Sequence, residues 1–270
     1  MSETLLEPDE PAPFQRSRPE GRSRFVIVVD HAGRRIPRRL ASLGLAAADL
    51  ERHIAWDIGA LGVAEHVSRR LDAPLISQVY SRLVIDCNRD PEVPTSIPRI
   101  SEATEIPGNR DLAEGDVRAR RREIFVPYHD CIAALLDSRA AAARPVILVA
   151  QHTMTDVYHG VRRPMHAAVL YNRDRRFAGL MLEMLRRDKS VQIADNQPYF
   201  VSDATDYTIP RHGERRGLPH VEIEIRQDLV RDAGAQAEWA ERVADALEGA
   251  ASRLDTLPNP APRSDNGDNR

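Results

Sequence analysis

Three residues, His31, Asp57 and His152, are of the types that together hold a catalytic zinc ion. Each histidine comes just after a run of apolar residues, and Asp57 lies where a helix is predicted to begin. Two imidazoles, one carboxylate and an open fourth position are a common ligand set for catalytic zinc. No His-Glu-x-x-His motif fixes the geometry. The alternative is that the histidines bond to loop backbone and that Asp57 only complements a helix N-terminus.

Two glutamates, Glu222 and Glu224, lie two residues apart in a stretch with strict alternation, 221–226. In a strand this spacing places both carboxylates on one face of the sheet. A glutamate beside a metal can take a proton from water and pass it to a leaving amine. The alternative is that the pair belongs to the solvated face of an edge strand.

Several other polar residues are candidates for substrate binding. Arginine suits bidentate recognition of carboxylates, so Arg82, Arg89 and Arg226, with Asn88, are expected to hold an acidic substrate. Away from a metal site the same residues would be surface charges or ion pairs. His212, in a loop with turn residues, either contacts substrate or water or has no role.

The elements that must position these residues alternate between strands and helices. This order predicts an α/β fold with functional groups at the carboxyl ends of the strands. No linker or repeat divides the chain, so a single domain over 23–256 is expected, with disordered tails at 1–22 and 257–270. The predicted strands are 25–29, 75–80, 146–150, 167–171, 191–194 and 221–226, with a further apolar run at 82–86, and the predicted helices are 57–71, 112–142, 177–187 and 235–254.

Composition excludes several classes of function. The 270 residues carry a net charge of -3, which gives no general attraction to nucleic acid or to an anionic membrane. No apolar run is long enough to span a bilayer and no signal peptide is apparent, so a cytoplasmic location is expected. Cys87 and Cys131 are expected to be buried thiols. Nothing in the sequence indicates the oligomeric state.

Seven segments together resemble the N-formylglutamate amidohydrolase family of zinc-dependent hydrolases. They are 30–33 with 36–37, 53–60, 80–89, 151–153, 196–199, 211–213 and 217–228. The resemblance implies a mostly parallel mixed sheet flanked by helices, of the phosphorylase/hydrolase-like type related to zinc carboxypeptidases. It implies His31, Asp57 and His152 as the zinc ligands.

The resemblance also implies a catalytic glutamate on the late strand. We favour Glu224 over Glu222, because Glu224-Ile225-Arg226 resembles the Glu-Leu-Arg of carboxypeptidase-type enzymes. Asn88-Arg89 is similar to the pair with which such enzymes hold a substrate carboxylate. One departure is that Arg34 stands three residues after His31, where carboxypeptidases have a glutamate ligand, so the carboxylate must come from elsewhere in the chain.

The expected function is therefore zinc-dependent hydrolysis of the amide bond of a small acidic N-acyl amino acid. N-formyl-L-glutamate, giving formate and L-glutamate, is the expected substrate, with Glu224 as general base. Two alternatives stay open. One is a zinc amidase or carboxypeptidase that acts on another acylated amino acid or on a peptide. The other is a non-catalytic module that binds a small acidic metabolite.

Overall fold

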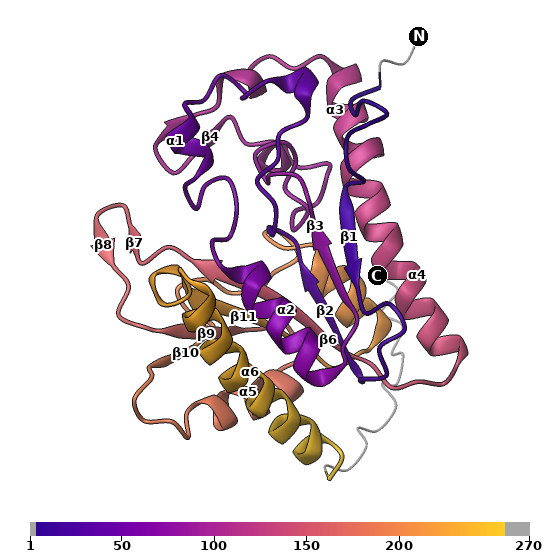
Figure 1. Ribbon diagram of the computed structural model, residues 1–270, viewed down its shortest axis with the longest axis vertical. Helices are drawn as coiled ribbons and strands as arrows, with labels where there is room; N and C mark the ends of the chain where they lie inside the picture. The colour runs from indigo at the N-terminus through magenta and orange to yellow at the C-terminus, as the bar shows by residue number, and fades with distance from the viewer. Residues whose placement is uncertain (1–3, 257–270) are drawn as a thin grey trace, which may run out of the picture.

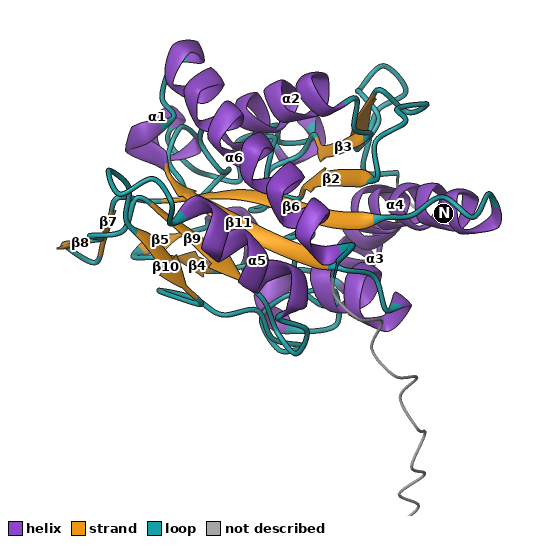
Figure 2. Ribbon diagram, turned by 90° about the horizontal axis from the view of Figure 1, so that it is seen from below, coloured by secondary structure: helices purple, strands orange, loops and turns teal. Residues whose placement is uncertain are grey.

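A seven-stranded sheet forms the middle layer of the protein, and a computed structural model describes residues 4–256 (Figures 1 and 2). The strand order across the sheet is β1-β3-β2-β6-β11-β9-β10. The strands are β1 (Phe14–Ser17), β2 (Phe25–Val29), β3 (Leu75–Gln78), β6 (Ile147–Met154), β9 (Ala167–Leu170), β10 (Ile193–Asp195) and β11 (His220–Arg226).

The sheet is mixed and mostly parallel, as expected. Strands β3, β2, β6 and β11 are parallel to one another, and β10 is parallel to β9. The antiparallel pairs are β11 with β9 and β1 with β3. Two small hairpins lie outside this sheet, β4 (Ile100–Ser101) with β5 (Thr104–Glu105) and β7 (Val157–Tyr158) with β8 (Val161–Arg162).

Helices cover both faces of the sheet because its central strands are apolar on both. Phe25, Ile27 and Val29 pack in one core cluster with α2, α5 and α6, whereas Val26 and Val28 pack in a second cluster with α4. A π-helical turn at 121–125 joins α3 to α4. The helices are α1 (Ala47–Leu50), α2 (Ala60–Leu71), α3 (Glu114–Arg120), α4 (Val126–Ala141), α5 (Arg176–Leu185) and α6 (Ala233–Leu254).

The structure corrects three local expectations. Residues 14–17 form β1, because hydrogen bonding to β3 orders a segment that has no hydrophobic period of its own. The apolar run 82–86 is not a strand, and its residues 82–84 form a turn. Helix α2 begins at Ala60, so Asp57 precedes the helix. The predicted tail at 257–270 lies outside the described residues.

The two cysteines are free thiols, Cys87 buried and Cys131 half-buried. Between residues 4 and 256, no helix combines the length and the apolar character needed to cross a membrane.

Candidate metal centre and active site

The carboxyl ends of β2 and β6 bring His31 and His152 together. From β2 the chain passes through α2 to β3, which lies on one side of β2 in the sheet. It later forms β6, which lies on the other side of β2, so the strand order changes direction between β2 and β6. Such a switch point is where open α/β sheets bind ligands. His31 is the second residue after β2. Strand β6 runs to Met154, further than the sequence predicted, and carries His152 inside the strand.

Asp57 is fixed between the two segments that carry the histidines. Its backbone N–H donates to the carbonyl of His31 at 2.8 Å, and its Oδ2 lies 3.3 Å from the backbone nitrogen of Thr153. The turn into α2 uses Gly59, whose φ of 82° is in the left-handed region. A Cβ at that position would lie 2.3 Å from the carbonyl oxygen of Val230, so the turn requires glycine.

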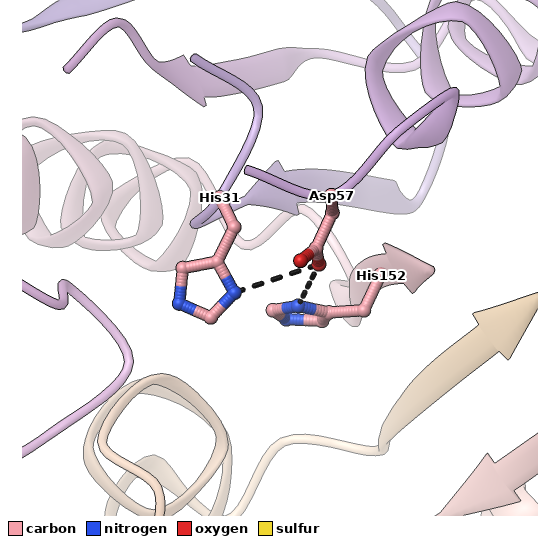
Figure 3. A group of neighbouring side chains, drawn as sticks. All are labelled: His31, Asp57 and His152. Atoms are coloured by element: carbon pink, nitrogen blue, oxygen red, sulfur yellow. Dashed lines mark hydrogen bonds and ion pairs between the residues drawn. The ribbon is translucent and has the colours of Figure 1, made fainter. Parts of the chain in front are cut away.

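The three side chains point toward one another, as Figure 3 shows. Asp57 Oδ2 lies 2.9 Å from His152 Nδ1 and 3.5 Å from His31 Nδ1. One ligand atom from each residue falls within 4.8 Å of the other two, and all three residues are buried. Nδ1 of His31 has no hydrogen-bond partner although it is buried. A buried nitrogen without a partner, beside a carboxylate and a second imidazole, fits a divalent metal ion.

Two further carboxylates, those of Asp86 and Asp30, lie behind the histidines. Nε2 of His31 is 2.7 Å from Oδ1 of Asp86, and Nε2 of His152 is 3.3 Å from Oδ2 of Asp30. Histidines that ligate metals commonly present the second ring nitrogen to a carboxylate, which fixes ring orientation and tautomer. The arrangement leaves both Nδ1 atoms facing the space beside Asp57. Sequence reasoning missed Asp30 and Asp86, although each stands at the end of an apolar run.

The charges around the histidines favour a cation. Burial and a nearby guanidinium lower the pKa of His31, but the carboxylates of Asp86 and Asp57 outweigh them and the pKa is raised. Burial also lowers the pKa of His152, and the surrounding carboxylates raise it well above its ordinary value. A metal ion that binds at the two Nδ1 atoms therefore replaces protons.

Both glutamates of β11 face the same space. Glu224 is paired in register with His152 on β6, and Glu222 and Glu224 line one cavity with the three candidate ligands. Strand β11 lies between β6 and β9, so the alternative of an edge strand is wrong. Burial raises the pKa of Glu224 to about 7. Burial also raises the pKa of Glu222 well above its ordinary value. A carboxylate with a pKa near neutrality is suited to act as a general base.

Arg82, Asn88 and Arg89 line the same cavity, which has a volume of about 740 Å³. Arg82 donates to Asp86 at 2.8 Å, and Nε of Arg89 lies 3.5 Å from the same carboxylate. The Arg89 side chain is 31% exposed, so it can reach an anionic ligand. The amide of Asn88 is used within the protein, since it donates to Asp206 and accepts two backbone N–H groups.

Arg226 and His212, which the sequence indicates as candidates for contact with substrate, do not line this cavity. The Arg226 guanidinium pairs with Asp228 at 2.7 Å and donates to the carbonyl of Arg163 at 3.0 Å. His212 is buried behind the site, with its Nε2 3.0 Å from Nδ1 of His129. Burial lowers the pKa of His212 to about 3, so the ring is neutral at physiological pH.

Comparison with known proteins assigns the chain to a family. Residues 23–231 match the sequence model of N-formylglutamate amidohydrolase. The chain belongs to the N-formylglutamate amidohydrolase family. This membership confirms the resemblance seen in the seven segments and supports an amidohydrolase activity.

Two crystal structures are similar to this member of the family. Gene product Atu2144 from Agrobacterium tumefaciens is 37% identical, with a TM-score of 0.90 over 93% of this chain and 99% of that chain. N-formylglutamate amidohydrolase from Ralstonia eutropha JMP134 is 21% identical, with a TM-score of 0.65 over 91% of this chain and all of that chain, and shows the shared fold. No curated protein matches the sequence.

Proposed function

We propose that this protein is a zinc-dependent amidohydrolase that cleaves the amide bond of a small acidic N-acyl amino acid. The proposed substrate is N-formyl-L-glutamate, which gives formate and L-glutamate. The observation that carries the proposal is the group of His31, Asp57 and His152, in which two buried Nδ1 atoms face one carboxylate oxygen.

These three residues would hold the metal, and Asp86 and Asp30 would orient the two imidazoles. Nitrogen and carboxylate ligands in this number are those of catalytic zinc sites. When bound there, zinc lowers the pKa of water and polarises a carbonyl oxygen.

Glu224 is proposed as the general base. It accepts a proton from the attacking water and returns it to the amide nitrogen as the carbon–nitrogen bond breaks, so the water oxygen ends on the acyl carbon and the proton on the amine. Its Oε2 is buried without a partner and is therefore free to accept that proton. Burial raises the pKa of Glu222 well above its ordinary value, which favours its neutral form, and in that form it could donate a hydrogen bond to substrate.

Arg89 and Arg82 are proposed to hold the substrate carboxylates. Both guanidinium groups lie beside Asp86 at the inner, charged part of the cavity. This places positive charge next to the proposed metal ligands, where an acidic amino acid would be oriented for cleavage.

Two alternatives share this site. A zinc amidase or carboxypeptidase that acts on another acylated amino acid or on a peptide would use the same ligands and base. A non-catalytic module for a small acidic metabolite would use only the arginines, and the unpartnered Nδ1 of His31 argues against it.

The deciding experiment measures the metal content of protein purified without added metal, together with formate release from N-formyl-L-glutamate before and after chelation. We expect about one zinc per chain, as one ligand group implies, and formate release that chelation abolishes and zinc restores. His31→Gln should lose both the metal and the activity. His66→Gln, which changes a histidine on α2 away from the cavity, should keep both.

Zinc without formate release would refute N-formyl-L-glutamate as substrate and favour another acylated amino acid. Protein that binds no metal even after supplementation would refute the mechanism and favour the binding module.

A further inference from the structure

Exposed apolar side chains gather at the mouth of the cavity. Seven large hydrophobic residues are exposed between residues 4 and 256, and four of them line the cavity. These four, called the apolar rim below, are Ile100, Tyr158, Tyr199 and Phe200, which are 59%, 39%, 41% and 64% exposed. Scattered exposed apolar residues are ordinary, whereas a group around a cavity marks a binding surface.

The apolar rim comes from three separate segments. Ile100 belongs to β4, Tyr158 to β7, and Tyr199 and Phe200 to the loop after β10. The hairpin of β7 and β8 projects from the edge of the protein in Figure 1. Because residues distant in sequence meet here around one opening, the rim is a property of the fold and not of one apolar stretch.

Arg163 fixes one side of the rim. Its guanidinium lies 5.2 Å from the ring centroid of Tyr158 and 4.7 Å from that of Tyr199. It also donates to the hydroxyl of Tyr199 and, at 3.2 Å, to the carbonyl of Thr155. Arg163 is itself buried, and removal of its guanidinium from water strengthens its attraction to the aromatic rings. The two tyrosine rings therefore form a preformed wall.

The cavity thus has two parts of different chemistry. The inner part holds the candidate metal ligands, Glu224 and the guanidinium groups of Arg82 and Arg89, and the outer part holds the apolar rim, with Arg99 beside Ile100. The volume of about 740 Å³ lies in the upper part of the range of about 300–1,000 Å³ that is typical of pockets for drug-sized ligands. A formyl group on an amino acid leaves the outer part of such a cavity unfilled.

We propose that the apolar rim is a subsite for an apolar acyl chain, so that the protein binds N-acyl amino acids with acyl groups longer than formyl and gains affinity from them. The inference rests on the proposed function, because it assigns the amino-acid part of the substrate to the inner arginines. That part carries the carboxylates, so the acyl part is the one that can be apolar. The rim is continuous with the cavity that holds the ligand group, which favours substrate over a separate protein partner as its occupant.

The test measures binding to the metal-loaded protein by calorimetry for N-formyl-, N-butanoyl- and N-hexanoyl-L-glutamate. Glu224→Gln prevents turnover during the titration. Each methylene buried in the rim should lower Kd by up to about fourfold, from about 0.8 kcal/mol per buried CH₂. Adding Phe200→Ser to Glu224→Gln should flatten this dependence on chain length and leave Kd for the formyl compound unchanged. Adding Val126→Ser instead, at an exposed valine on α4 away from the cavity, should preserve the dependence.

A Kd that does not fall with acyl length would overturn the subsite. The same conclusion would follow from a dimer in solution that Phe200→Ser converts to monomer, because the rim would then be an interface between copies. Failure of the proposed function is distinguishable from failure of the subsite. If affinity rises with acyl length but the unsubstituted protein hydrolyses none of these amides, the result supports the subsite and refutes the activity.

Discussion

Replacing Asp86 by asparagine tests whether the carboxylate behind His31 sets the metal affinity of the site. Asp86 Oδ1 lies 2.7 Å from Nε2 of His31 and accepts the backbone N–H of Asn88 at 2.9 Å, while Oδ2 accepts from Arg82 at 2.8 Å. Asp86→Asn keeps the shape of the side chain and one acceptor oxygen. It removes the negative charge that strengthens the bond to the imidazole N–H.

The energy of the hydrogen bond and the usual effect on metal affinity indicate the same size of loss in zinc binding. A hydrogen bond to a charged group contributes about 1.5–3 kcal/mol. Loss of a carboxylate that orients a ligand histidine typically weakens metal binding by about 10- to 100-fold. Since about 1.4 kcal/mol corresponds to a factor of ten, these figures agree. We therefore expect Asp86→Asn to raise Kd for zinc by about 10- to 100-fold.

The effect should depend on pH in a defined direction. In the metal-free protein, burial and Arg82 lower the pKa of His31. Asp86 and Asp57 raise this pKa by more, so that it lies above its ordinary value. Protons therefore compete with the metal for this imidazole at low pH. Asp86→Asn lowers that pKa and relieves the competition, so the loss of zinc affinity should be largest at alkaline pH and shrink as the pH falls.

The assay is competition for zinc against a chromogenic chelator, at mildly acidic and mildly alkaline pH. Asp137→Asn, at an exposed aspartate paired with Arg216, is the matched control and should leave Kd unchanged. Thermal unfolding of the metal-free variants checks that Asp86→Asn stays folded. An unchanged Kd at alkaline pH, or an equal shift in the control, would refute the reasoning.

Four further predictions concern the base, the substrate contact and the fold. Glu224→Gln should lower kcat by about 10²- to 10⁴-fold without changing metal content; retention of kcat would move the base to another residue. Burial raises the pKa of Glu224 to about 7, and the base acts in its deprotonated form. We therefore expect kcat/KM to decline as the pH falls through and below this value, and a kcat/KM that rises at acidic pH would contradict this role. Arg89→Ala should raise KM for N-formyl-L-glutamate with kcat retained, as expected for loss of uniform binding, and an unchanged KM would exclude this contact. Arg226→Met should leave KM unchanged and lower the free energy of unfolding by about 1.5–3 kcal/mol, because it removes the donor to the carbonyls of residues 163–165 and leaves Asp228 with only the exposed Arg162. Denaturant titration would measure this loss.

The ligand group could be predicted from the sequence because it depends on two local facts. Buried strands are visible as apolar runs, and the carboxyl ends of neighbouring parallel strands lie together. His31 and His152 therefore lie at one edge of the sheet, and they are close because β2 and β6 are neighbours. The roles of Asp30 and Asp86 could not be predicted, since they depend on which ring nitrogen faces the metal, and tertiary packing decides that.

Other features depend on contacts that no local pattern records. Arg226 alternates in phase with Glu224 along β11, but alternation does not show that the carbonyls of residues 163–165 accept from its guanidinium. Strand β1 is ordered by its neighbour β3 and not by an apolar period of its own. Hairpins and a loop form the apolar rim, and sequence periodicity does not show where such segments meet in the fold.

The order of the central strands has a consequence for the synthesis of the chain. Strands β2, β6 and β11 are adjacent in the sheet, yet they arise early, midway and late along the sequence. Asp57 and His152 are 95 residues apart, so a growing chain that has not yet produced β6 lacks one of the three candidate ligands. Metal can nucleate the folding of very small domains, whose ligands are close in sequence. In this protein the candidate ligands come from segments that follow β2 and from β6, so metal capture at the proposed site would require β2 and β6 to have paired.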